Sequence, residues 1–193
     1  NVGDVAGMGA DLFESYVGSM IGAMVLAAAA SSAELVFLPL FLAAAGIGVS
    51  ILGTFFVKTK EGGNPQTALN IGVFGSGAVM LAVSYWLINK FVTASVNLSS
   101  SHSSVVAGDL FGATVVGLIS GVLIGLLTEY YTSDHQKPSQ AIAEASETGS
   151  ATNIISGLAN GMYSTALPVL VIALSIMGAY HFAHLYGIAL AAL

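Results

Sequence analysis

The chain lacks cysteine and carries very little charge. Its 193 residues include no Cys and only 7% charged residues, with four Lys and Arg against ten Asp and Glu. Without cysteine there is no disulfide framework and no thiolate metal site. The net charge of −6 and the absence of clustered basic residues exclude nucleic acid as an expected partner, because a protein binds a phosphate backbone through such clusters.

Apolar residues are abundant instead. They make up 55% of the chain, and the mean hydropathy of +0.86 is typical of helical membrane proteins. The sequence begins at Asn1, has no basic segment followed by a cleavage site, and ends within the apolar run from Tyr186 to Leu193. We therefore interpret residues 1–193 as a single transmembrane domain that is an internal fragment of a longer protein.

Apolar length predicts the number of helices, because a transmembrane helix needs about 20 mostly apolar residues. Five full spans and the start of a sixth are expected, at about 4–30, 35–57, 68–89, 110–128, 154–180 and 182–193. The predicted fold class is all-α, a polytopic transmembrane helix bundle. Pro39 lies early in the second span, where a missing N–H does least damage, and Pro168 predicts a kink in the fifth.

Three further segments carry local signals. Gly117, Gly121 and Gly125 form a small-residue ladder in the fourth span, which indicates a packing face. Residues 90–108 form a polar, Ser-rich connection, and residues 133–150 form the most polar loop, with a short helical turn expected through Ala141 to Ala145.

Three carboxylates lie on one face of the first predicted helix. At about 100° per residue, Asp4 and Asp11 nearly superimpose, and Glu14 lies about 60° away. Small residues that let helices approach closely in lipid share this face: Gly3, Gly7, Ser15, Gly18 and Gly22. The acidic face is therefore expected to point into a helix bundle.

The depth of these acids predicts an ion path. Glu14 lies roughly 15 Å along the axis from Asp4, near the middle of a hydrocarbon core of about 30 Å if Asp4 is at its surface. A carboxylate there costs at least about 2.5 kcal/mol unless it is solvated, paired or protonated. In the alternative, the helix begins near Asp11, and the deeper acids lie among the headgroups.

The lysines predict the orientation. Alternating spans put Lys58, Lys60 and Lys137 on the side where the first helix begins, and Lys90 on the other. By the positive-inside rule, the Asp4 end faces the cytoplasm.

The first sixteen residues resemble a family signature. Asn1 to Tyr16 is similar to the motif of membrane-integral, ion-pumping pyrophosphatases, Asp-Asn-Val-Gly-Asp-(Val/Ile)-Ala-Gly-Met-Gly-(Ala/Ser)-Asp-Leu-Phe followed by (Gly/Glu)-Ser-Tyr, and lacks only the leading Asp. Thr128 to Ser133, Ala151 to Ala159 and Tyr186 to Leu193 also resemble the family. The resemblance therefore spans the whole chain.

The resemblance implies a 16-helix, homodimeric protein that hydrolyses Mg-pyrophosphate at the cytoplasmic face of a prokaryotic inner membrane. Asp4 matches the carboxylate that positions the attacking water and holds Mg²⁺ together with Asp, Lys and Asn residues absent from this chain. Without the resemblance, Asp4 would be interpreted as a first-turn acid favoured by the helix dipole. Asp11, Glu14 and Ser15 match the ion gate, whose oxygen ligands suit a dehydrated cation or a proton relay. A K⁺ requirement is implied, with its determinant on a later helix.

The position of Glu14 favours Na⁺ as the transported ion. Plant-type proton pumps of the family have Gly there and carry the gate Glu one turn later, where this chain has Gly18. Glu at position 14 resembles the sodium-pumping members, although some proton pumps share it. The alternatives are an H⁺-pumping member of the family, an ion-coupled secondary transporter without hydrolysis, and a rotary-ATPase subunit. The rotary subunit is disfavoured because its ion site lies in a short helical hairpin.

Overall fold

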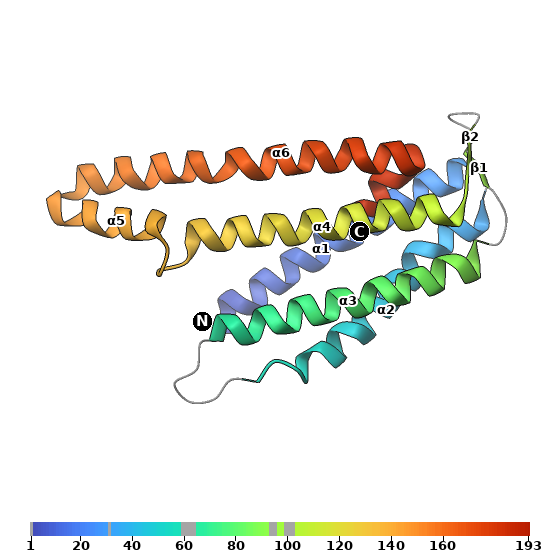
Figure 1. The fold of residues 1–193 in the computed structure, drawn as a ribbon, viewed down its shortest axis with the longest axis horizontal. Coiled ribbons are helices and arrows are strands. Elements are labelled where there is room, and N and C mark those ends of the chain that lie inside the picture. The colour runs from blue at the N-terminus through green and yellow to red at the C-terminus, as the bar shows by residue number, and fades with distance from the viewer. Residues whose placement is uncertain (1, 31, 59–64, 93–95, 99–102) are drawn as a thin grey trace. The chain divides into compact units, whose positions relative to one another are not determined.

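The computed structural model describes residues 2–30, 32–58, 65–92, 96–98 and 103–193. The helices and strands, in chain order (Figure 1), are α1 Val2–Ala29, α2 Ala33–Thr54, α3 Pro65–Phe91, β1 Val96–Leu98, β2 Ser103–Val105, α4 Ala107–Thr132, α5 Lys137–Thr148 and α6 Ser150–Ala191. Five helices of the described part are long and apolar enough to cross a membrane. The expected class of helical membrane protein is therefore confirmed.

The chain divides into two compact units. Unit 1 comprises Asn1–Gly117 with Ala179–Leu193, and unit 2 comprises Leu118–Gly178. Both α4 and α6 therefore contribute residues to each unit. A single transmembrane domain over residues 1–193 stays a prediction.

The core of unit 1 lies where α1 ends and α2 begins. Helix α1 packs on α2, and α2 packs on α3, but α1 buries only Ala23 and Ala27, both in its second half. The core draws on every helix of this unit: Ala23, Ala27, Leu35, Leu38, Leu42, Leu87, Ile88, Val92, Val105, Leu110, Ala113, Ala179, Ala183, Tyr186 and Leu190. The opposite end, where α1 and α3 begin (Figure 1), contains none of these residues.

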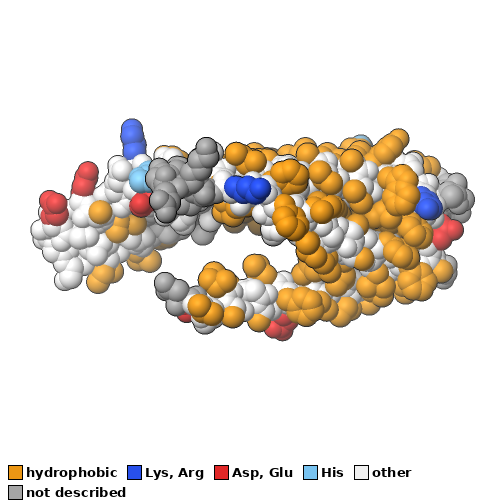
Figure 2. Space-filling model, turned by 90° about the horizontal axis from the view of Figure 1, so that it is seen from below, with side chains coloured by type: hydrophobic (Ala, Val, Ile, Leu, Met, Phe, Trp, Pro, Cys, Tyr) orange, Lys and Arg blue, Asp and Glu red, His pale blue; other side chains and the backbone are white. Residues whose placement is uncertain are grey.

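Large apolar side chains also cover the outside of the helices (Figure 2). In α1, Leu12 and Phe13 are 70% exposed, and in α6, Leu158 and Met162 are similarly open. Exposed apolar area on this scale is rare on soluble monomers. The helix surfaces are suited to lipid or to further helices rather than to water.

A buried tyrosine completes the hydrogen bonding of α2. Ser32 caps this helix by accepting from the Leu35 N–H, so Pro39 lies in its second turn. Proline has no N–H, and the Leu35 carbonyl therefore lacks its usual helical donor. The Tyr186 hydroxyl donates to that carbonyl at 2.8 Å from 151 positions away. Tyr186 supplies the donor that Pro39 removes, so the Leu35 carbonyl keeps a hydrogen bond. The early position of Pro39 in the helix did not predict this compensation.

The backbone of α6 leaves helical geometry at Ala183 and His184. His184 has φ 51°, a conformation that favours glycine. Gly187 is needed just after the break, because a Cβ there would meet the Ala179 carbonyl oxygen. The departure lies beyond Pro168, where a kink was expected, and next to residue 182, where a sixth helix was expected to begin. It redirects the last segment so that Tyr186 reaches α2.

Glycines bring α4 close to the end of α6 within unit 1. A Cβ at Gly112 would lie 2.8 Å from the Phe182 ring, and a Cβ at Gly117 would meet the Ala191 backbone. Gly121 and Gly125 have no such neighbour within 4 Å. Of the expected ladder, Gly117 alone packs closely among the residues that the structure describes.

A short hairpin lies within the polar connection after α3. Strands β1 and β2 pair antiparallel, with Val96 opposite Val105 and Leu98 opposite Ser103. The hairpin was not predicted, because three-residue strands are too short to show a period of two.

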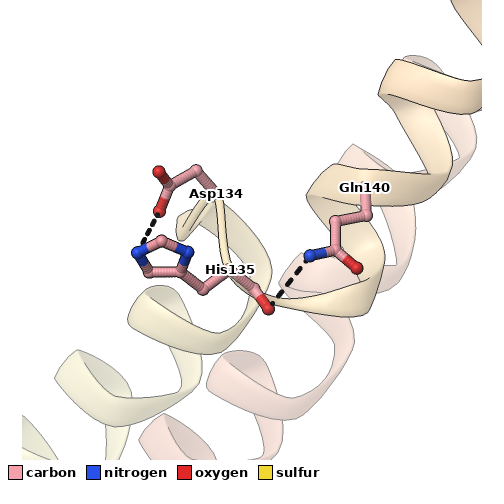
Figure 3. Close-up of polar contacts among 3 residues, drawn as sticks. All are labelled: Asp134, His135 and Gln140. Carbon is pink, nitrogen blue, oxygen red and sulfur yellow. Dashed lines mark hydrogen bonds and ion pairs between the residues drawn. The ribbon is translucent and has the colours of Figure 1, made fainter.

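In unit 2, hydrogen bonds at both ends hold α5, a 12-residue helix. At its start (Figure 3), the Gln140 amide of α5 donates to the His135 carbonyl at 3.3 Å. In the turn before the helix, His135 Nε2 lies 3.5 Å from Asp134 Oδ1. At its end, the Thr152 hydroxyl donates to the Ala145 carbonyl at 2.9 Å. The expected turn at 141–145 is thus the middle of a longer helix.

We expect Tyr186→Phe to lower the free energy of unfolding by about 1–3 kcal/mol, because a buried carbonyl loses its donor. In a Pro39→Ala background the residue 39 N–H can bond to Leu35, so the same substitution should cost less. Denaturation of the four proteins of this cycle measures the coupling. Tyr180→Phe is the control, since no hydrogen bond of its hydroxyl is seen in the described structure. An equal loss in both backgrounds would contradict the compensation.

We expect Gly117→Ala to destabilise the protein by about 1–3 kcal/mol, because the Ala191 backbone must move to admit the new methyl group. Gly121→Ala, one turn along the same helix, should be neutral or stabilising, since alanine favours a helix more than glycine. Thermal unfolding in detergent compares the two. Equal midpoints would show that the close approach at Gly117 is not required.

Candidate functional site

The site residues predicted from the sequence all lie on α1. Asp4 stands in its first turn, and Asp11, Glu14 and Ser15 follow on the same side at helical spacing. The side chains of all four are exposed. The structure thus places them along one helix face, while their roles stay predictions.

The glycines on this face have open space around them. A Cβ at Gly3, Gly7, Gly18 or Gly22 would meet nothing within 4 Å. The Ser19 hydroxyl donates to the backbone carbonyl of Ser15 at 3.2 Å, and the Ser15 hydroxyl takes no part in this bond. The expected packing of this face into a bundle is not seen among the described residues, because the helices present here pack on the other end of α1.

An acidic face at membrane depth needs partners. Uncovered carboxylates at Asp11 and Glu14 would carry the cost of a charge in hydrocarbon, at least about 2.5 kcal/mol for each at the bilayer centre. A cation, a basic side chain or water can remove that cost. Within the described ranges, no group of three or more His, Cys, Asp or Glu side chains could hold a metal ion. The residues of α1 can therefore contribute only part of a cation site.

The donor set is chemically suited to hard cations. Carboxylate and hydroxyl oxygens are the ligands that Mg²⁺ and similar ions prefer, and a carboxylate at a helix start can also orient a water for attack on phosphorus. Asp4 can supply one such ligand, and Asp11, Glu14 and Ser15 can supply a second set further along the helix.

The whole chain matches a known family. A family model described as inorganic H⁺ pyrophosphatase covers residues 1–193. The chain belongs to this family. With five membrane-competent helices, it is an integral membrane protein of the inorganic H⁺ pyrophosphatase family.

Similar proteins carry the names of both sodium and proton pumps. A Clostridium tetani protein provisionally named K(+)-stimulated pyrophosphate-energized sodium pump is 44% identical over 199 residues, 97% of this chain and 27% of that protein. The pump of that name from Thermotoga maritima is 36% identical over 211 residues, 96% of this chain and 28% of its own length. The K(+)-insensitive pyrophosphate-energized proton pump 2 of Moorella thermoacetica is 41% identical over 183 residues, 93% of this chain and 26% of its own.

The chain spans about a quarter of the length of the curated relatives it matches. Family members with either ion in their names are similarly related to it, so membership does not separate Na⁺ from H⁺. The sequence prediction assigned the transported ion from the position of Glu14 on the acidic face of α1.

The lysines used to predict the orientation are only partly described. Lys58 follows α2, Lys90 lies in the last turn of α3 at the other end of unit 1, and Lys137 begins α5 in unit 2. Lys60 and Asn1, the first residue of the motif, lie outside the described residues. A cytoplasmic position for Asp4 stays a prediction.

Proposed function

We propose that the chain is part of a membrane-bound inorganic pyrophosphatase that couples cytoplasmic Mg-pyrophosphate hydrolysis to Na⁺ export. The observation that carries this proposal is the acidic face of α1, in a chain whose full length matches the pyrophosphatase family. On this face, Asp4 stands in the first turn, and Asp11, Glu14 and Ser15 lie deeper along the helix.

Asp4 would act at the hydrolytic end. Its carboxylate can ligate Mg²⁺ or accept a hydrogen bond from the attacking water, with the other ligands supplied by parts of the protein outside this chain. Mg²⁺, when bound, neutralises the charge of pyrophosphate. Asp4 is thus proposed as one member of a larger site.

Asp11, Glu14 and Ser15 would form the ion gate. Their oxygens can replace part of the hydration shell of Na⁺ in a region where an unpaired carboxylate is costly. Glu14 lies roughly 15 Å along the axis from Asp4. Because both groups stand on one continuous helix, a movement of α1 at the substrate site would be transmitted to the gate.

An H⁺ pump is the second candidate within the family. It is supported by the 41% identity to the Moorella thermoacetica proton pump, and a carboxylate pair can relay protons as well as bind Na⁺. K⁺ stimulation accompanies the sodium-pump name of the Thermotoga maritima relative, and we propose it here together with Na⁺. The cytoplasmic site, the homodimer and the prokaryotic inner membrane are proposed on the family resemblance.

We expect Asp4→Asn in the complete protein to reduce pyrophosphate hydrolysis by about 100-fold or more, because the amide cannot replace the carboxylate as base or ligand. Ion uptake driven by pyrophosphate should fall in parallel. Asp134→Asn, at an exposed turn of unit 2, is the control. Ion uptake that survives undiminished without hydrolysis would instead indicate a secondary transporter.

We expect the double variant Glu14→Gly with Gly18→Glu to weaken the activation of hydrolysis by Na⁺. The change moves the acid by one turn, and position 18 has room for a side chain within the described structure. Hydrolysis rates titrated with Na⁺ at saturating Mg²⁺ and K⁺ measure the effect. An unchanged Na⁺ titration would remove the basis for assigning the ion from Glu14.

A further inference from the structure

A lysine is held over an indole ring near the end of α3. The Lys90 ammonium lies 4.7 Å from the Trp86 ring centroid, a distance at which the ring attracts a cation. Trp86 is 58% exposed, and the adjacent Tyr85 is 56% exposed. We call these three residues the α3 end patch. It presents a positioned positive charge beside two open aromatic rings.

Neighbouring contacts hold the α3 end patch outward. The Tyr85 ring meets Phe111 of α4 edge-on at 5.1 Å, and the Asn89 amide donates to the Tyr85 carbonyl at 2.8 Å. Leu87 and Ile88, on another side of the same turns, are buried in the core of unit 1. The patch therefore cannot turn inward without removing that core contact.

The position of the patch suits the headgroup region of a bilayer. Lys90 is the single charged residue of α3, a helix long and apolar enough to span a membrane, and it lies in the last turn. Trp and Tyr rings concentrate at membrane interfaces, and lysines near helix ends extend their ammonium groups toward the headgroups. The two preferences coincide at this end of α3.

We propose that the α3 end patch binds an anionic phospholipid. The Lys90 ammonium would donate to the lipid phosphate, and the Trp86 and Tyr85 rings would lie against the glycerol region. Charge complementarity supports this partner, because no carboxylate among the described residues lies within ion-pairing distance of Lys90. The aromatic rings, which have no use for a dissolved ion, favour a lipid over free phosphate.

Lipid retention by the complete protein tests this proposal. The protein is reconstituted in vesicles containing phosphatidylglycerol and phosphatidylcholine in equal amounts and then extracted in mild detergent, and the bound lipids are counted by mass spectrometry. Lys90→Gln should retain less phosphatidylglycerol per chain than the unmodified protein, because its affinity for that lipid should fall about fivefold. Trp86→Leu should show a partial loss.

Matched variants separate lipid binding from misfolding. Lys90→Arg keeps the charge and should retain the lipid. Lys137→Gln removes an exposed lysine from α5, an element outside the α3 end patch, and should also retain it. Equal retention by Lys90→Gln and the unmodified protein would overturn the proposal. So would displacement of phosphatidylglycerol by excess inorganic phosphate, since that result would assign the patch to a free anion.

Discussion

The carbonyl oxygen of Leu35 has no donor in its own helix, and the packing of unit 1 is arranged to supply one. Lipid offers no hydrogen bonds, so a backbone group left open by Pro39 must be satisfied by the protein itself. The Tyr186 hydroxyl does this at 2.8 Å, and it reaches α2 because α6 breaks at His184. Around this bond, the helix ends of unit 1 form its core.

Charged groups in lipid also need partners, and the acidic residues of α1 lie toward the end of that helix that is away from the core. The core covers the second half of α1, whereas Asp11 and Glu14 in the first half are exposed. Charged groups at membrane depth need partners even more than backbone carbonyls do. In the proposed pump, Asp4 would be the hydrolytic carboxylate, and Asp11 and Glu14 would be the ion-binding carboxylates. Because all three stand on one continuous helix, α1 would link the two sites mechanically.

Signals local in the sequence were sufficient to predict the long apolar helices but not the short elements or the contacts between helices. Runs of apolar residues predicted five full spans and the start of a sixth at 182–193. The described part has five helices that are long and apolar enough, and the last of them extends to Ala191. The β1–β2 hairpin and the full length of α5 were missed, because short polar segments lack a clear period. The role of Tyr186 could not be predicted, since its partner lies 151 positions away. The shared face of Asp4, Asp11 and Glu14 followed from helical spacing alone. The identity of the transported ion could not be read from that spacing, because relatives named as sodium pumps and as proton pumps share similar identity with this chain.

Pyrophosphate hydrolysis and sodium uptake, measured together in sealed membrane vesicles that contain the complete protein, test the central claim most directly. At saturating Mg²⁺ and K⁺, the account predicts hydrolysis that requires Na⁺ and drives uptake of radioactive sodium even in the presence of a protonophore. Hydrolysis at a rate independent of Na⁺, together with acidification of the vesicle lumen, would contradict the sodium assignment and indicate that the gate conducts protons. An absence of pyrophosphate hydrolysis under all these conditions would contradict the proposed activity itself.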